Sequence, residues 1–199
     1  MNGVRCFVAL ELQPETVGAL VAAGSALRTA APTWRNEKWV AEDNLHITLR
    51  FLGSLAEDRI QPLERALSAA LDTQSEFALR LAGVRAVPSA KRCSMVWASF
   101  DDSQDRACER VAESVSAAVA EFTAEESRRF AAHVTLVRAR RPHRLDADAL
   151  LAANEALNCA NASMSVRSAT LFASTLTRQG PIYERLARWD FSGADSAAN

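Results

Sequence analysis

The chain has 199 residues, 49% of them hydrophobic, and its 23 Lys and Arg residues against 24 Asp and Glu residues give a formal net charge of −1. This composition fits one soluble domain, or two small lobes that share a core. It excludes a protein that holds long nucleic acid through a bulk excess of positive charge. No segment has the roughly 18 consecutive apolar residues of a membrane span, and Glu11, Gln13 and Pro14 interrupt the N-terminal run too early for a secretory signal. We therefore expect a cytoplasmic protein with no membrane partner.

The first half of the chain predicts a strand, a helix, a short extended segment and a second strand. The apolar run 4–12 predicts the first strand, and Pro14 begins a helix whose apolar face continues to Leu27. Residues 34–40 predict a short strand or an extended loop. In the segment 44–53 apolar and polar residues alternate, which predicts a strand with one buried face. Its apolar face holds Leu45, Ile47, Leu49 and Phe51, and its polar face holds His46, Thr48 and Arg50.

The second half mixes further helices and strands without a Gly- or Ser-rich linker. Helical spacing predicts helices over 60–71, 104–122 and 146–157, and alternation predicts strands over 77–84, 94–100, 132–139, 164–173 and 182–188. Adjacent strands that can pair as hairpins favour an α+β fold over a doubly wound parallel sheet. We expect one domain over residues 1–191 and a disordered tail over residues 192–199.

The four cysteines predict neither a metal site nor a disulfide framework. Cys6, Cys93, Cys108 and Cys159 are scattered and form no C-x-x-C pair. We expect four buried, inert thiols.

A short internal repeat includes two of the three histidines. His-Ile-Thr-Leu begins at His46 and His-Val-Thr-Leu begins at His133, 87 positions later. In a strand, the His and Thr of each motif share one face and the two apolar residues share the other. The third histidine, His143, lies beside Pro142 and is expected to be an exposed loop residue.

Two such motifs that face each other would suit a phosphodiester. One imidazole can act as a general base while the other, protonated, gives a proton to the leaving oxygen. The hydroxyls of Thr48 and Thr135 can donate hydrogen bonds to nonbridging phosphate oxygens. This scheme requires no metal, and the residues leave open which histidine is the acid.

Four segments of the chain resemble one known family. They are RCFVALEL near the start, NLHITLRFLG and FAAHVTLVRAR around the two motifs, and LFASTLTRQGPIYERLARW near the end. They are similar to segments of the two-histidine phosphoesterase superfamily, and more narrowly of the RNA 2′,3′-cyclic phosphodiesterases, also called bacterial 2′-5′ RNA ligases.

The resemblance implies a bilobal α+β fold with pseudo-twofold symmetry, in which antiparallel sheets line a central cleft and helices lie outside. It implies hydrolysis of a 2′,3′-cyclic phosphate on an RNA end to a 2′-phosphate, with neither a metal nor a cofactor. His46 matches the histidine that protonates the 3′ leaving oxygen, and His133 matches the partner that orients or activates water. Thr48 and Thr135 match the phosphate-binding threonines, and Arg138 matches the basic residue that follows the second motif.

Two positions depart from simple expectation. The family usually has Pro before the second histidine, where this chain has Ala132, and the backbone that leads to His133 is therefore less restricted. Strict alternation also places Arg138 on the face opposite His133 and Thr135, so it reaches the phosphate only if the strand bends. Arg50, by contrast, has the same parity as His46.

The resemblance implies RNA ends with a 2′,3′-cyclic phosphate as the partner, tRNA fragments among them, and a monomeric protein. The Arg-rich segment 128–144 around His133 is a candidate local path for RNA phosphates, and Phe7 and Trp39 are candidate walls for a base. Other readings stay open. The substrate could be the cyclic phosphate of a small nucleotide or an ADP-ribose derivative, reversible 2′-5′ RNA ligation could be a further activity, or the protein could bind RNA ends without turnover.

Overall fold

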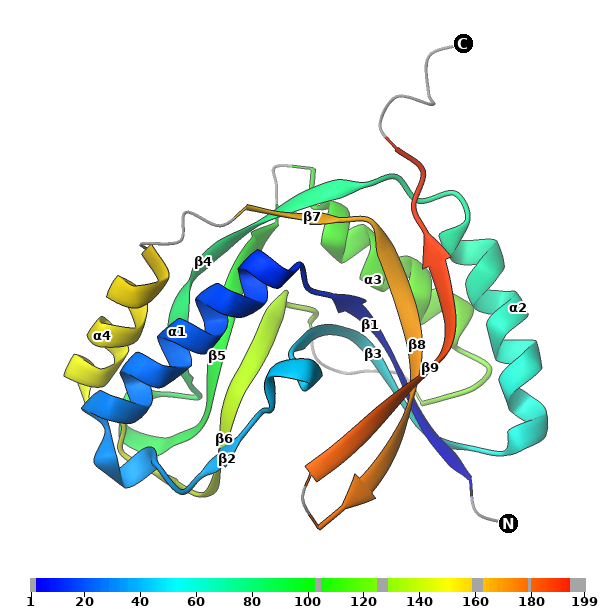
Figure 1. Ribbon diagram of the computed structural model, residues 1–199. Coiled ribbons are helices and arrows are strands. Elements are labelled where there is room, and N and C mark those ends of the chain that lie inside the picture. Colours follow the sequence, from blue (N-terminus) through cyan, green and yellow to red (C-terminus); the bar gives the residue numbers. More distant parts are fainter. Residues whose placement is uncertain (1–2, 103–104, 125–128, 159–162, 179, 194–199) are drawn as a thin grey trace.

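The structure is a computed structural model that describes residues 3–102, 105–124, 129–158, 163–178 and 180–193. Two antiparallel sheets diverge toward the bottom of Figure 1, with helices beside each of them. The predicted α+β class and the bilobal arrangement are confirmed. Among the described residues, no helix is long and apolar enough to cross a membrane.

The first sheet has four strands in the order β3-β1-β8-β9. The helix α2 (Ile60–Leu71) buries its Leu63, Leu67 and Leu71, and it packs against α3 (Ala107–Ala118) on the right of Figure 1. The strands span Val4–Glu11 (β1), His46–Leu55 (β3), Ser168–Thr177 (β8) and Gly180–Asp190 (β9).

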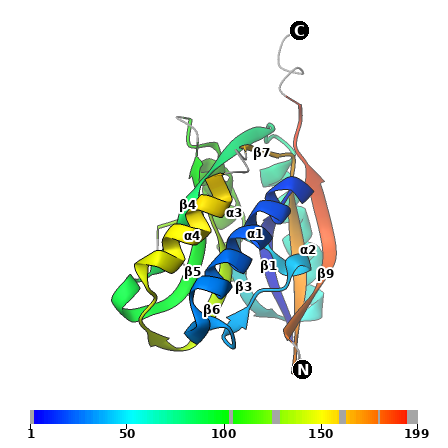
Figure 2. The same cartoon turned by 60° about the vertical axis from the view of Figure 1, so that its left-hand side comes forward.

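The second sheet has five strands in the order β2-β6-β5-β4-β7. The helices α1 (Pro14–Ala30) and α4 (Ala147–Asn158) lie side by side along it, as both views show (Figures 1 and 2). The strands span Lys38–Trp39 (β2), Phe77–Val87 (β4), Cys93–Asp102 (β5), His133–His143 (β6) and Ser163–Val166 (β7). Short 3-10 turns cover Pro32–Trp34, Glu42–Asn44, Glu57–Arg59 and Ala90–Arg92.

The predicted strand 164–173 is wrong as a single element. The chain leaves the second sheet after β7 and enters the first sheet with β8, and Arg167 separates the two strands. The Arg167 guanidinium lies 3.3 Å from the Glu76 carboxylate, and the backbone carbonyl of Arg167 accepts a hydrogen bond from the Phe191 amide. Apolar residues on both sides of the crossing are buried, so the sequence pattern continues through it without a visible break.

The C-terminal segment stays attached one residue beyond the expected domain boundary. Ser192 donates its amide to the Gln74 carbonyl and accepts from the Glu76 amide. The remainder of the expected tail, residues 194–199, lies outside the described residues.

Three of the four cysteines are buried, as predicted. Cys6, Cys93 and Cys108 are buried and free, and burial raises the pKa of Cys6 to about 11 and also raises that of Cys108. Cys159 lies outside the described residues.

Candidate active site

The two motifs open onto one cleft. His46 and Thr48 come from β3, His133 and Thr135 come from β6, and all four line a cavity of about 1730 Å³ between the sheets. Arg138 lines the same cavity. The structure therefore brings together all five site residues that the sequence predicts.

A β-bulge at Leu49 decides which later residues of β3 face the cleft. Ala9 of β1 pairs with Thr48 and the adjacent Val8 pairs with Arg50, so Leu49 is the extra residue. After the bulge the alternation is reversed: Arg50 is 5% exposed and donates to the Ala124 carbonyl, while Phe51 is 54% exposed. The expectations that Arg50 shares a face with His46 and that Phe51 lies on the buried face are both wrong, for this one reason.

β6 contains the same irregularity at the equivalent place. Trp97 of β5 pairs with Thr135 and Val96 pairs with Val137, so Leu136 is the extra residue. Leu136 and Val137 are both buried, and Arg138 returns to the cleft, where its guanidinium contacts the Met95 sulfur. The bend that Arg138 needs is therefore present.

The two imidazoles are held in the same way. Nδ1 of His46 lies 2.7 Å from the Asn44 carbonyl, and Nδ1 of His133 lies 2.8 Å from the Ala131 carbonyl. Because a carbonyl only accepts, each Nδ1 carries the proton and each Nε2 is left for chemistry. The residue two positions earlier holds the ring in both cases, so the absence of Pro at Ala132 does not remove this support for His133.

Each histidine lies against a different aromatic partner. The His46 ring centroid is 4.9 Å from that of Phe7 and 5.4 Å from that of Tyr183, and its Nε2 lies 3.0 Å from the Thr48 hydroxyl. The His133 ring stacks on Trp97 at 3.7 Å, and the Arg85 guanidinium lies 5.4 Å from the Trp97 ring. The sequence does not predict Trp97, Tyr183 and Arg85 as site residues, because they come from strands outside the motifs.

Both histidines have a lowered pKa. Burial is the largest cause for each, and it outweighs the backbone hydrogen bonds at Nδ1, which raise the pKa. The positive charge of Arg138 lowers both values further, and Arg85 lowers that of His133. In the free protein both rings are therefore mostly neutral at pH 7.

The cleft is much more basic than the whole chain. Eight Arg and Lys side chains line it, against three Glu side chains. The local positive charge reconciles a formal net charge of −1 with an anionic ligand. The cations are Arg28, Arg35, Lys38, Arg129, Arg138, Arg140 and Arg178, together with Arg50, which borders the cavity from the buried face of β3, and the acids are Glu37, Glu109 and Glu113.

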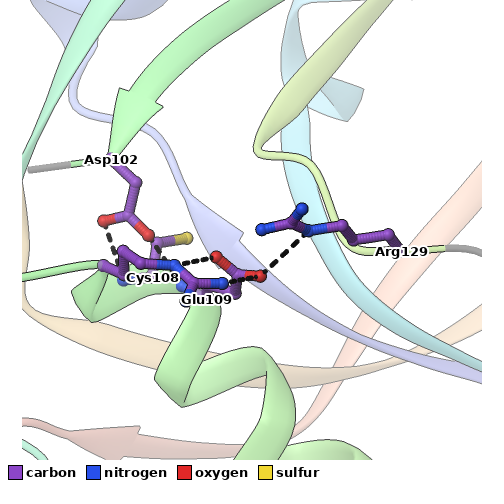
Figure 3. Close-up of polar contacts among 5 residues, drawn as sticks. Asp102, Cys108, Glu109 and Arg129 are labelled. Atoms are coloured by element: carbon purple, nitrogen blue, oxygen red, sulfur yellow. Dashed lines mark hydrogen bonds and ion pairs between the residues drawn. The ribbon is translucent and has the colours of Figure 1, made fainter.

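The first turn of α3 contributes an ion-pair cluster to one side of the cleft. The Asp102 carboxylate accepts hydrogen bonds from the Cys108 and Glu109 amides at 3.0 and 2.8 Å, which caps the helix. The Glu109 carboxylate binds the guanidinium groups of Arg106 and Arg129, the latter at 3.4 Å (Figure 3). Arg129, one of the cations of the Arg-rich segment, is therefore already paired.

Three other predicted positions have different outcomes. His143 is not an exposed loop residue: it ends β6, stacks on Trp34 at 4.4 Å, and its Nε2 lies 3.3 Å from the Glu37 carboxylate. Phe7 is 3% exposed beneath His46, so it supports the site and is not an open wall for a base. Trp39 lines the cleft.

The described residues contain no group of three or more His, Cys, Asp or Glu side chains that could hold a metal ion. The described side chains that converge on the histidines are hydroxyls, guanidinium groups and aromatic rings. Such groups bind anions and stack on rings, and they are poor ligands for a divalent cation.

Comparisons with known proteins agree with the geometry. The family model described as LigT like Phosphoesterase matches residues 11–97 and 100–183, and each matched stretch contains one motif. An RNA 2′,3′-cyclic phosphodiesterase of Archaeoglobus fulgidus is 32% identical over 75% of this chain and 81% of that protein. One from Methanothermobacter thermautotrophicus is 26% identical over 90% of this chain and 95% of that protein. The crystal structure of TT0787 of Thermus thermophilus has a TM-score of 0.75 at 27% identity, covering 96% of this chain and 99% of that one. The chain belongs to the LigT-like phosphoesterase family.

Proposed function

We propose that this protein hydrolyses 2′,3′-cyclic phosphates at RNA ends to 2′-phosphates without a metal ion. The observation that carries the proposal is the convergence of two His-x-Thr pairs and Arg138 on one cleft. The relatives from Archaeoglobus and Methanothermobacter are named RNA 2′,3′-cyclic phosphodiesterases, which supports the substrate class. The cytoplasm, where RNA fragments arise, is the expected location.

The reaction divides the proton transfers between the two Nε2 atoms. A water oxygen attacks phosphorus while His133 Nε2 accepts its proton, and the bond between phosphorus and O3′ breaks. His46, protonated on Nε2, gives its proton to O3′, which leaves a free 3′-hydroxyl and a 2′-phosphate. After this step His133 is protonated and His46 is neutral, which is the reverse of the starting state. Proton exchange with solvent restores the starting state.

Thr48, Thr135 and Arg138 stabilise the phosphate. In the neutral state the Thr48 hydroxyl donates to His46 Nε2 at 3.0 Å; once that nitrogen is protonated, the hydroxyl proton is free to turn toward a phosphate oxygen. Thr135 occupies the equivalent place beside His133. The Arg138 guanidinium supplies a fixed positive charge where negative charge accumulates on the nonbridging oxygens.

The size and charge of the cleft favour an RNA end over a small nucleotide. Sites for small molecules usually enclose about 300–1,000 Å³, whereas this cleft encloses about 1730 Å³. Its surplus of cations extends well beyond the histidines, which suits a ligand with more than one phosphate. Reversible 2′-5′ ligation would use the same groups in the opposite direction, with a ribose hydroxyl in place of water.

The test is turnover of an oligoribonucleotide that ends in a 2′,3′-cyclic phosphate, in the presence of EDTA, with identification of the terminus formed. We expect a 2′-phosphate, and a loss of about 10²–10⁴ in kcat for both His46→Ala and His133→Ala. His143→Gln is the matched control, since this third histidine does not line the cleft, and it should retain activity. A requirement for added metal, a 3′-phosphate product, or no turnover of any cyclic phosphate would contradict the proposal.

The pH dependence gives a second test of the histidine pair. kcat/KM requires one ring protonated and one neutral in the free enzyme. Because both pKa values lie below the ordinary 6.5, the singly protonated pair is most abundant below pH 6.5 and declines as the pH rises above it. A bell-shaped profile with its maximum on the acid side of pH 6.5 is expected, and a flat profile over pH 5 to 9 would count against acid-base catalysis by two histidines.

A further inference from the structure

The cations of the cleft differ in whether a carboxylate already binds them. On the α3 side, Arg129 is paired with Glu109 (Figure 3), and Glu113 adds a second acid to the lining. On the opposite side, beside β2 and the last turn of α1, the side chains of Arg28, Arg35, Lys38 and Arg140 form no ion pair with any described residue. The two sides of the cleft therefore offer very different electrostatic environments to an RNA chain.

These cations, which no described carboxylate binds, continue directly from the phosphate site. Lys38 of β2 pairs in register with Arg138 of β6, and directly opposed residues in an antiparallel pair point to the same face. Lys38 is thus the next cation along the sheet from the guanidinium assigned to the cyclic phosphate. Both side chains line the cleft.

Contacts of Trp39, the residue after Lys38, orient a further cation that lines the cleft, Arg28. The Trp39 indole N–H donates to the Trp34 carbonyl at 2.9 Å, and the Arg28 guanidinium lies 4.3 Å above the Trp39 ring. A cation–π contact orients the guanidinium and leaves its charge unneutralised. Trp39 therefore serves as the support for Arg28, with its ring covered.

Among the described residues that line the cleft, Glu37 is the one acid on this side, and its carboxylate is engaged by β6. The Glu37 side chain is 14% exposed; its carboxylate accepts the Arg140 backbone amide at 2.6 Å and lies 3.3 Å from His143 Nε2. The Glu37 carboxylate therefore binds to β6. The hydrogen bond from the Arg140 backbone amide holds the backbone at Arg140, and the exposed Arg140 side chain lines the cleft.

We propose that the RNA chain on the 5′ side of the cyclic phosphate leaves the active site across β2 and the C-terminal end of α1, over Lys38, Arg28, Arg35 and Arg140, and not along α3. This inference rests on the proposed function. The ligand is a single-stranded polyphosphate backbone, which binds to a row of unpaired cations largely through counterion release. A mononucleotide has no phosphate to place there, so the track distinguishes an RNA end from a cyclic nucleotide.

The experiment compares two substrates in one set of variants. The substrates are hexa-adenylate with a 2′,3′-cyclic phosphate end and 2′,3′-cyclic AMP, and the measured quantity is the ratio of their kcat/KM values at low and moderate salt. The test variant is Arg28→Gln combined with Arg35→Gln, because both residues are exposed and lie apart from the histidine motifs. Arg129→Gln removes a cation from the α3 side, and Arg65→Gln removes an exposed cation from α2, outside the cleft.

In the wild type we expect a preference for the hexanucleotide that weakens as salt increases. The double variant should lose about tenfold or more of kcat/KM for the hexanucleotide at low salt, and the slope against log salt should become shallower by ~0.7 for each contact removed. Its turnover of cyclic AMP serves as the internal reference. Arg65→Gln should match the wild type, and Arg129→Gln should reduce the preference less than the double variant does.

The outcomes separate the two proposals. Wild-type hydrolysis of both substrates with equal kcat/KM, or a preference that the double variant retains, overturns the track and leaves the proposed function standing. A larger loss in Arg129→Gln than in the double variant overturns the track in favour of a path along α3. No hydrolysis of either substrate overturns the proposed function and the track together.

Discussion

The two motif strands, β3 and β6, have nearly the same backbone and different side chains around it. Each has a histidine held at Nδ1 by the carbonyl two residues earlier, and each has a bulge three residues after that histidine. The fifth residue after the histidine then enters the cleft in both strands, and it is Phe51 in one and Arg138 in the other. The two strands therefore provide two equivalent positions in the cleft, and the side chains make the position on β3 apolar and the position on β6 cationic.

The neighbouring strands extend this difference. Phe7, Phe172 and Tyr183 form an aromatic cluster in the first sheet, and of these three Tyr183 lines the cleft, together with Phe51. The second sheet presents Trp97 and Arg85 beside its histidine. One lobe thus offers an apolar wall to a nucleoside, and the other offers positive charge to a phosphate. Exchanging or removing these groups one at a time tests how far the two lobes have diverged.

Among the groups that surround the two histidines, the largest effect is expected at the fifth position after each histidine. Arg138→Gln removes a charged partner of the phosphate worth about 1.5–3 kcal/mol, which corresponds to a loss of roughly 10- to 150-fold in kcat/KM. The same change removes a positive charge that lowers the pKa of both histidines, so the maximum of the kcat/KM profile should move to higher pH. Phe51→Leu is the matched change in the other lobe, and it should leave the position of the maximum unchanged. Equal shifts in both variants would show that the lobes do not differ in this way.

An intermediate effect is expected at the two threonines. Thr48→Val and Thr135→Val each remove one hydroxyl donor to the phosphate at nearly constant volume, for a loss of about 1 kcal/mol, or roughly fivefold in kcat. Thr48→Val should lose more, since its hydroxyl also bonds to His46 Nε2. Single-turnover rates at saturating substrate measure the difference. A greater loss in Thr135→Val would contradict the assignment of the two hydroxyls.

The smallest effect is expected at Arg85, which reaches His133 only through Trp97. Burial is the main cause of the lowered pKa of His133, and the Arg85 charge adds to it. Arg85→Gln should therefore raise the pKa of His133 and leave that of His46 in place, whereas Arg138→Gln should raise both. NMR titration of the two imidazoles separates these cases. Parallel shifts of both rings in Arg85→Gln would exclude a local effect.

Much of the fold and the central part of the candidate site could be predicted from the sequence. Alternation in segment 44–53 places His46 and Thr48 on one face, and the repeat places His133 and Thr135 in the same relation. These predictions depend on the first three residues of each motif, where both strands are regular. The structure confirms this placement, and the catalytic roles stay predictions.

The sequence pattern fails beyond the bulges, for a physical reason. A bulge reverses the alternation without a change in residue type, since Leu49 and Leu136 look like ordinary strand residues. Alternation therefore assigns Arg50 and Phe51 to the wrong faces. The repeat itself gives one indication of the correct face. Phe51 lies 87 positions before Arg138, the same spacing as between the two histidines, so the two residues are equivalent, and a cleft position for one implies a cleft position for the other. The expectation for His143 is wrong because β6 continues through Pro142, an unusual residue inside a strand.

The crossing of the chain between sheets at Arg167 has a mechanical consequence. β7 belongs to one lobe and β8 to the other, and the single residue between them is held by Glu76 and Phe191. A hinge that opened the lobes would have to break these bonds, since one residue supplies no slack. We therefore expect the two lobes to move little relative to each other, so that the distance between the two histidines changes little when substrate binds. A cleft whose width stays nearly constant suits a small strained ring whose two reacting oxygens need fixed positions.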